Sequence, residues 1–223
     1  MGKQSFIIGL VVLGLIAFVL GVEILTDIVS GIYTVVLIAL GITSLLVPLF
    51  YWAFTVPMKR TYKIRKGWKR SYFKPSFHLK ERDLTYTFII HAHLEKDPNK
   101  GTQKIFGFSY GHHHKNSIRL GYRVIDKNVA VVYPYYYIDG VRYDETQFAE
   151  IVEVNKKYKV THRLIGDVMH TYIYDDNDKP LTHRKSVKGF KAKPGYYLYP
   201  YYETDDNKGA IQEMRITIHV LSA

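Results

Sequence analysis

The sequence contains no cysteine among its 223 residues. This absence excludes disulfides, thiolate zinc sites and cysteine nucleophiles. The P-loop and H-E-x-x-H motifs are also missing, and no pair of carboxylates falls in an apolar setting. The acidic residues gather instead in turn-like stretches such as 175–178 and 203–206. We therefore expect a protein that is not an enzyme and that uses no cofactor.

Charge is scarce in the first quarter of the chain. Residues 1–58 contain one basic residue, Lys3, and two acidic residues, Glu23 and Asp27, so the other 30 Lys and Arg lie beyond Met58. The formal net charge of +11 belongs almost entirely to that later part. Such a surface indicates a polyanionic partner, such as lipid headgroups, nucleic acid or a phosphorylated small molecule, or else solvated charge with no specific partner.

Two uncharged apolar runs explain this low charge, one from Phe6 to Val22 and one from Ile28 to Phe54. Each has a length that suits a membrane-spanning helix. Their short connection allows only an antiparallel hairpin, because unpaired backbone cannot lie in lipid. No small-x-small cleavage site follows the first run, which argues against a cleaved signal peptide. The sequence therefore predicts a membrane α-hairpin over residues 1–58.

A basic juxtamembrane stretch, residues 59–71, follows the second run. By the positive-inside rule, this stretch and the N-terminus lie in the cytoplasm. The expected location is thus a bacterial inner membrane, with the C-terminal domain in the cytoplasm. The stretch would either bind anionic membrane lipid or act only as a stop-transfer signal. Its basic residues include Lys59, Arg60, Lys63, Arg65 and Lys66.

From residue 72 onward, apolar side chains recur with a period of two, which is typical of β-strands. Clear examples are residues 84–94, 117–124 and 129–138, and the last of these runs into Asp139-Gly140, a strong hairpin signal. Strands at this spacing predict an antiparallel β-sandwich or barrel over residues 72–223. Further strands are expected at 147–154, 158–165, 168–174, 195–202 and 210–221.

Two prolines fall inside these predicted strands, Pro134 in 129–138 and Pro200 in 195–202. Proline has no amide N–H to donate to a β ladder. We therefore expect edge strands or bulges at both places.

The densest group of functional side chains lies in residues 105–123. Arg119 and Arg123 project from the same side of a strand, and guanidinium groups bind phosphate through two parallel hydrogen bonds. If the histidines continued a strand, His112 and His114 would point to one side and His113 to the other. No carboxylate lies nearby to complete a metal site, and none is predicted. The candidate ligand-binding residues here are His112, His114, Lys115, Ser117, Arg119 and Arg123.

The chain has 20 tyrosines, many of them in residues 133–143 and 196–202. Tyrosine rings stack on nucleic-acid bases in a sequence-tolerant way, so Tyr135 and Tyr137 are candidate ligand-binding residues too. Alternatively, these rings fill the interior of the sandwich, as aromatic residues in β proteins usually do. Beside arginines they favour a nucleotide-like ligand rather than a long nucleic acid.

The predicted layout of hairpin, basic stop and cytoplasmic β domain resembles the two-transmembrane, β-strand-rich effectors of bacterial cyclic-oligonucleotide anti-phage systems. This resemblance implies that the β domain senses a cyclic (oligo)nucleotide and that the membrane helices assemble as a homo-oligomer to disrupt the inner membrane. It assigns no binding residue. Residues 106–123 and 195–203 are also similar to a bacterial β-sandwich family, which implies the fold alone. The main alternative is a membrane-tethered β-sandwich that binds a glycan, a lipid headgroup or a protein partner.

Overall fold

The computed structural model describes residues 9–16, 32–54, 59–71, 76–91, 103–144, 146–181, 185–203, 209–210 and 212–222. The chain forms two compact units, Met1–Thr55 and Val56–Ala223. The first unit contains a helical segment at residues 9–16 and helix α2 (Ile32–Phe54). These two helices approach closely at Gly14, where an added Cβ would lie 2.8 Å from the Ser44 hydroxyl oxygen.

The predicted membrane α-hairpin is wrong, because no helix within the described ranges is long and apolar enough to cross a membrane. At 1.5 Å per residue, the segment 9–16 extends about 12 Å, whereas the hydrocarbon core of a bilayer is about 30 Å thick. The prediction of a transmembrane effector depends on this hairpin and is wrong for the same reason. Of the residues predicted to bound the two runs, Phe6, Val22 and Ile28 lie outside the described residues, and Phe54 ends α2.

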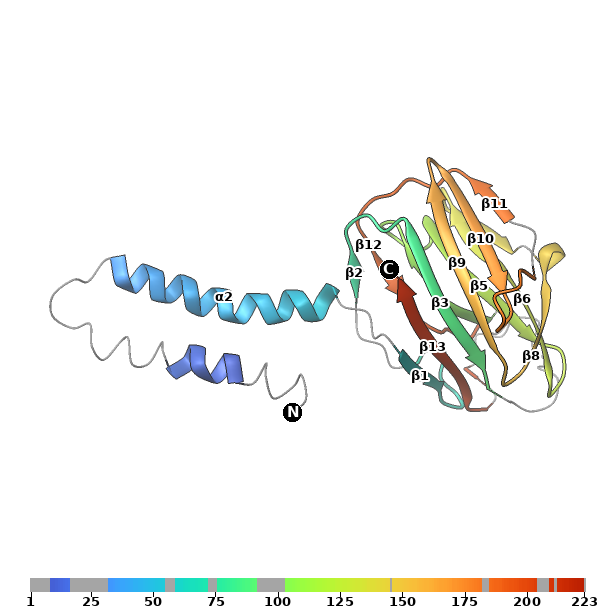
Figure 1. The fold of residues 1–223 in the computed structure, drawn as a ribbon, viewed down its shortest axis with the longest axis horizontal. Helices are drawn as coiled ribbons and strands as arrows, with labels where there is room; N and C mark the ends of the chain where they lie inside the picture. The colour runs from blue at the N-terminus through green and yellow to red at the C-terminus, as the bar shows by residue number, and fades with distance from the viewer. Residues whose placement is uncertain are drawn as a thin grey trace. The chain divides into compact units, whose positions relative to one another are not determined.

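The second unit is an antiparallel β-sandwich, which confirms that part of the predicted fold class (Figure 1). One sheet has six strands in the order β1-β13-β3-β9-β10-β11. Its strands are β1 (Lys59–Ile64), β3 (Asp83–Ile90), β9 (Lys157–Ile165), β10 (Val168–Tyr174), β11 (Lys185–Lys188) and β13 (Met214–Ser222).

The other sheet has seven strands, in the order β2-β12-β4-β5-β6-β7, with β8 paired to β6 as well. Its strands are β2 (Phe77–His78), β4 (Gln103–Ser109), β5 (Asn116–Val124), β6 (Val129–Ile138), β7 (Val141–Asp144), β8 (Glu150–Glu153) and β12 (Gly195–Leu198). A 3₁₀ turn, η1 (Thr146–Phe148), lies between β7 and β8.

The core lies between the two sheets and is rich in aromatic rings. Strand β3 alternates strictly, with Leu84, Tyr86 and Phe88 buried, while β4 contributes Phe106 from the opposite sheet. The Tyr86 and Phe106 rings meet edge to face, with centroids 5.3 Å apart, a preferred geometry for aromatic pairs. Many of the tyrosines therefore fill the core, as the second interpretation of their abundance expected.

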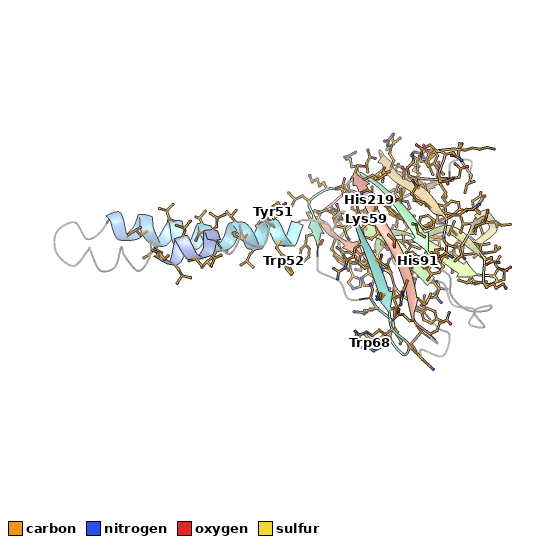
Figure 2. The ribbon with its side chains drawn as sticks, turned by 60° about the horizontal axis from the view of Figure 1, so that its bottom comes forward. Tyr51, Trp52, Lys59, Trp68, His91 and His219 are labelled. Carbon is orange, nitrogen blue, oxygen red and sulfur yellow. The ribbon has the colours of Figure 1, made fainter. Side chains whose placement is uncertain are left out.

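The basic stretch that the sequence places beside a membrane starts as an edge strand of the six-stranded sheet. Lys59, Arg60 and Lys63 lie in β1, and Arg65 and Lys66 follow directly. Because β1 alternates, its Tyr62 and Ile64 are buried in the core while the lysines face outward. Strand β1 pairs with β13 in a register that sets Lys59 against His219 (Figure 2).

Pro134 occupies a break in the pairing of β6. Strand β8 pairs with residues 129–132 of β6, and β7 pairs with residues 135–138. Pro134 lies between these two partners, where the missing N–H costs no ladder bond on that side. A proline is therefore tolerated in a strand that the sequence alone would place at an edge or a bulge.

Candidate functional site

The outward face of the seven-stranded sheet carries buried side chains that do not belong to the core. On β5, Ile118 and Leu120 are in the core cluster, so Ser117 and Arg119 lie on the opposite face. On β6, Tyr135 is only 1% exposed, yet it is not a member of that cluster. Large rings and a guanidinium are thus enclosed on the side of the sheet that faces away from the core.

These side chains enclose a cavity of about 280 Å³. Strands β4, β5, β6 and β12 all contribute, together with the chain that continues past β12. The lining residues are Arg70, Lys104, His113, His114, Arg119, Tyr135, Tyr137, Tyr196, Tyr197, Leu198, Tyr199, Pro200, Tyr201 and Glu203.

One wall of the cavity depends on an irregularity in β4. The register between β4 and β5 shifts between Lys104 and Gly107. Gly107 approaches β5 so closely that an added Cβ would lie 1.9 Å from the Ile118 carbonyl oxygen, so only glycine fits there. Beyond the shift, Lys104 and Tyr201 exchange two backbone hydrogen bonds of 2.9 and 3.0 Å. This pairing brings the chain after β12 over the sheet.

Arg119 is a buried charge in the cavity wall. The residue is 9% exposed, and its buried Nε has no hydrogen-bond partner within the described part of the chain. The tyrosines nearest to it electrostatically are Tyr135, Tyr196, Tyr137 and Tyr201. Burial lowers the pKa of Arg119 to about 10. The guanidinium therefore stays charged at neutral pH.

Lys104, by contrast, is already paired. Its ammonium contacts the Glu203 carboxylate and lies 4.6 Å from the centroid of the Tyr135 ring, within the range of a cation–π interaction. Arg142, from β7, approaches the other Glu203 oxygen at 3.8 Å and Asp144 at 3.6 Å. Burial lowers the pKa of Lys104, although its hydrogen bond to Glu203 opposes that shift.

Glu203 is held in place by the amide of a buried glutamine. The Gln103 side chain donates to the Glu203 carbonyl oxygen and accepts from the Glu203 N–H, both at 3.1 Å. Gln103 is itself fully buried. These two hydrogen bonds hold the backbone of Glu203 at the cavity wall, and Lys104 contacts its carboxylate.

The histidines lie in a turn rather than in a strand. Residues 113–115 form that turn, and the Ser117 hydroxyl secures it by donating to the His113 carbonyl oxygen at 2.7 Å. His113 Nδ1 and the Tyr196 hydroxyl oxygen are 2.6 Å apart, and that oxygen also accepts from the His113 N–H at 3.3 Å. These two contacts tie the ring and the backbone of His113 to one phenol, and the tautomer of the ring decides which atom of the Nδ1–hydroxyl pair donates.

Both cavity histidines are neutral at pH 7. Burial, followed by the nearby His114 and Arg119, lowers the pKa of His113 to about 4. Burial, followed by His112 and Arg119, lowers the pKa of His114 as well. Neutral imidazoles offer both a donor and an acceptor to a ligand.

The structure brings together four of the eight predicted ligand-binding residues. Arg119, His114, Tyr135 and Tyr137 line the cavity. Ser117 supports the histidine turn, His112 stacks on His113 with ring centroids 5.1 Å apart, and neither lines the cavity. Arg123 and Lys115 are not among its lining residues either. Within the described residues, no group of three or more His, Asp or Glu side chains could hold a metal ion.

Several lining residues were missed by the sequence analysis. His113 was expected to point away because residues 112–114 were taken as a strand, whereas they enter a turn. Glu203 resembled a solvated turn acid, and Arg70 belonged to the predicted membrane stop. Lys104 carried no signal, because a lysine beside an apolar run usually points to solvent. The tyrosine-rich segment 196–201 was the one available indication.

No protein-family model and no curated protein matches the sequence. Among solved structures, a functionally unknown protein from Saccharomyces cerevisiae is 9% identical with a TM-score of 0.43, over 76% of this chain and 91% of that one. An exolytic PL7 alginate lyase from Zobellia galactanivorans is 10% identical, TM-score 0.47, over 73% and 84%. The carbohydrate binding module CBM66 from Bacillus subtilis is 16% identical, TM-score 0.35, over 74% and 96%. At these scores the likeness carries no argument about what this chain binds.

Proposed function

We propose that the β-sandwich is a carbohydrate-binding module whose ligand enters the tyrosine-lined cavity on the seven-stranded sheet. The observation that carries this proposal is the composition of the cavity wall. Aromatic rings from β6 and β12 alternate with polar groups that both donate and accept hydrogen bonds. Sugar rings present apolar C–H faces beside hydroxyl groups, and this wall complements both.

The balance of donors and acceptors favours a glycan over a nucleotide. Arg119 and Lys104 donate, the Glu203 carboxylate accepts, and the neutral histidines and tyrosine hydroxyls do both. A hydroxyl group needs a donor and an acceptor together. A cyclic dinucleotide brings two phosphates, which would meet one unpaired buried guanidinium and the Glu203 carboxylate. Its charge fits this cavity less well.

The volume of the cavity limits the ligand to a small unit. Ligand pockets usually measure about 300–1,000 Å³, and this one measures about 280 Å³. It suits one sugar ring, with the rest of an oligosaccharide extending outward. A ring held by tyrosines on several strands would bind with defined orientation.

The test is calorimetric titration of the full chain with neutral and acidic trisaccharides, and with a cyclic dinucleotide in parallel. We expect saturable binding of a trisaccharide and none of the dinucleotide. Binding of the dinucleotide alone would overturn the proposal. Chromatography of the recovered trisaccharide shows whether it is intact, and cleavage would replace a binding module by a glycan-degrading enzyme.

A further inference from the structure

We propose that the sugar unit bound in the cavity carries one carboxylate, that Arg119 binds this carboxylate, and that Glu203 excludes ligands with more negative charge. This inference rests on the proposed carbohydrate binding and names the chemical class of the ligand. The resulting ligand is a uronic acid residue of an acidic glycan.

The first reason is that Arg119 is a buried charge without a partner. Its Nε lacks a hydrogen bond, and within the described residues no carboxylate forms an ion pair with it. Removing a charge from water carries a large desolvation penalty unless an opposite charge and hydrogen bonds compensate. The four tyrosines around Arg119 leave its positive charge uncompensated. An anionic group from a ligand would supply the negative charge that the described residues do not.

The second reason is that the other buried cation is satisfied. Lys104 is 6% exposed and contacts Glu203. Among the described residues, the two buried cations of the cavity therefore face one carboxylate, that of Glu203, whose side chain is 34% exposed, and this leaves room for one further negative charge. Arg70 also lines the cavity and Arg142 lies beside Glu203, but both of these arginines are exposed. A phosphate monoester carries nearly two negative charges at pH 7 and would face the Glu203 carboxylate with only Arg119 unpaired.

The third reason is the shape of the anchor. A guanidinium presents a planar fork of N–H groups that matches a carboxylate through two parallel hydrogen bonds. Gly107 faces Arg119 across the β4–β5 pair. Tyr135 lies opposite Arg119 on β6 and flanks the same position. A flat carboxylate fits this setting better than a tetrahedral sulfate ester.

The test is titration of the full chain at pH 7 with matched trisaccharides. The probes are trigalacturonate, triglucuronate and trimannuronate, the corresponding neutral trisaccharides, a sulfated galactotriose and galactose 6-phosphate. We expect one uronate to bind roughly 10- to 100-fold more tightly than its neutral match, which is the range for a charge-assisted hydrogen bond. Arg119→Gln should remove that preference, and Arg119→Lys should restore only part of it.

Arg123→Gln is the matched control. It removes the same charge from the same face of β5, at a position that does not line the cavity, so the uronate preference should persist. Glu203→Gln should raise the affinity for galactose 6-phosphate relative to the uronate. If it leaves that ratio unchanged, the role of Glu203 is overturned.

The outcomes separate this inference from the proposed function. Equal binding of uronate and neutral sugar, or a preference for the sulfate ester, would overturn the inference while carbohydrate binding stands. A uronate preference that survives Arg119→Gln would also overturn it. No binding of any sugar would overturn both.

Discussion

The two outward faces of the sandwich hold polar side chains in different ways. On the six-stranded sheet, threonine hydroxyls pair with each other across strands: the Thr85 and Thr161 hydroxyls are 3.1 Å apart, and the Thr61 and Thr217 hydroxyls 2.7 Å. The His91 ring, labelled in Figure 2, reaches Thr217 at 2.7 Å. These cross-strand hydrogen bonds satisfy the threonine hydroxyls and the His91 ring without any ligand.

The seven-stranded sheet differs, because its outward face buries long side chains, and one of them, Arg119, has no ion-pair partner within the described parts of the chain. Arg119 sits among tyrosines, whereas the exposed Arg163 of β9 on the six-stranded sheet pairs with Asp83 at 3.2 Å. A buried cation without a partner costs folding free energy. The candidate binding site therefore lies where a buried polar group has no hydrogen-bond partner among the described residues, rather than where charged side chains are most numerous.

The largest expected effect is on the shape of the cavity sheet. Gly107→Ala should reduce the free energy of unfolding by about 3 kcal/mol or more, because the new Cβ would clash with the Ile118 backbone. Urea unfolding followed by circular dichroism measures this loss. The matched change Gly166→Ala, in the open β9–β10 turn where the added Cβ meets nothing within 4 Å, should cost only the strain of its positive φ, about 1 kcal/mol. Equal losses at the two positions would show that the close β4–β5 approach is not needed.

A second effect concerns acid stability, which should depend on the core of the six-stranded sheet. His162 is fully buried on β9, and burial lowers its pKa to about 3. In the unfolded chain its pKa is about 6.5, so below pH 6.5 the His162 ring binds a proton in the unfolded state and not in the folded state. Stability should therefore be complete above pH 6.5 and fall by up to roughly 1.4 kcal/mol per pH unit on acidification.

Urea unfolding between pH 7 and pH 4.5 measures this dependence. In His162→Asn the slope that His162 contributes should vanish, while in His112→Asn, a change at an exposed histidine, the slope should remain. An unchanged slope in His162→Asn would assign the acid sensitivity to other groups.

The hydrogen bond between His113 and Tyr196 should matter moderately. Tyr196→Phe removes the hydroxyl that lies 2.6 Å from His113 Nδ1 and should weaken uronate binding about 5-fold, with a loss of roughly 1 kcal/mol in stability. The matched change is Tyr172→Phe on β10 of the six-stranded sheet. Titration with the preferred uronate should detect no effect of that change, and a comparable effect would contradict the assignment of the site.

The smallest effect should be the pH dependence of binding. As the pH falls from 7 to 5, partial protonation of His113 and His114 adds positive charge beside Arg119 and Lys104, against the single carboxylate of Glu203. The affinity for a uronate should rise a few-fold and that for a neutral sugar should not. A double change of both histidines to Gln should flatten the profile, and a fall in uronate affinity on acidification would contradict the account.

The strands were largely predictable because local alternation encodes them. The period-two patterns at 84–94, 117–124 and 129–138 correspond to β3, β5 and β6, and Asp139 and Gly140 both adopt positive φ at the hairpin. Strand β1 was not predicted from the sequence. Its Tyr62 and Ile64 alternate with other side chains in a stretch whose many basic residues indicated a segment beside a membrane. Strands β2 and β11 are too short to produce a pattern.

The site was only half predictable, because its members meet through long-range pairing. Arg119 and Tyr135 are neighbours across β5 and β6, so their strands suggested them. Lys104 and Glu203 come together only because a register shift in β4 lets Tyr201 pair with Lys104. No local pattern encodes that shift. The second apolar run does form a helix, α2, but no helix within the described ranges is long and apolar enough to cross a membrane, so hydropathy predicted the helix and not its role.

The most direct test of the central claim is the stability of Arg119→Met with and without the preferred uronate, measured by urea unfolding. The account predicts that the variant is as stable as the parent chain or more stable without ligand, because a buried unpaired charge has been removed. It also predicts that ligand at 100 times the parent's Kd stabilises the parent by about 2.7 kcal/mol and the variant by only about 0.4–1.4 kcal/mol, because binding weakened 10- to 100-fold leaves the ligand at about 1 to 10 times the variant's Kd. A loss of several kcal/mol in the variant without ligand would show that Arg119 supports the fold rather than a ligand, and would contradict the account.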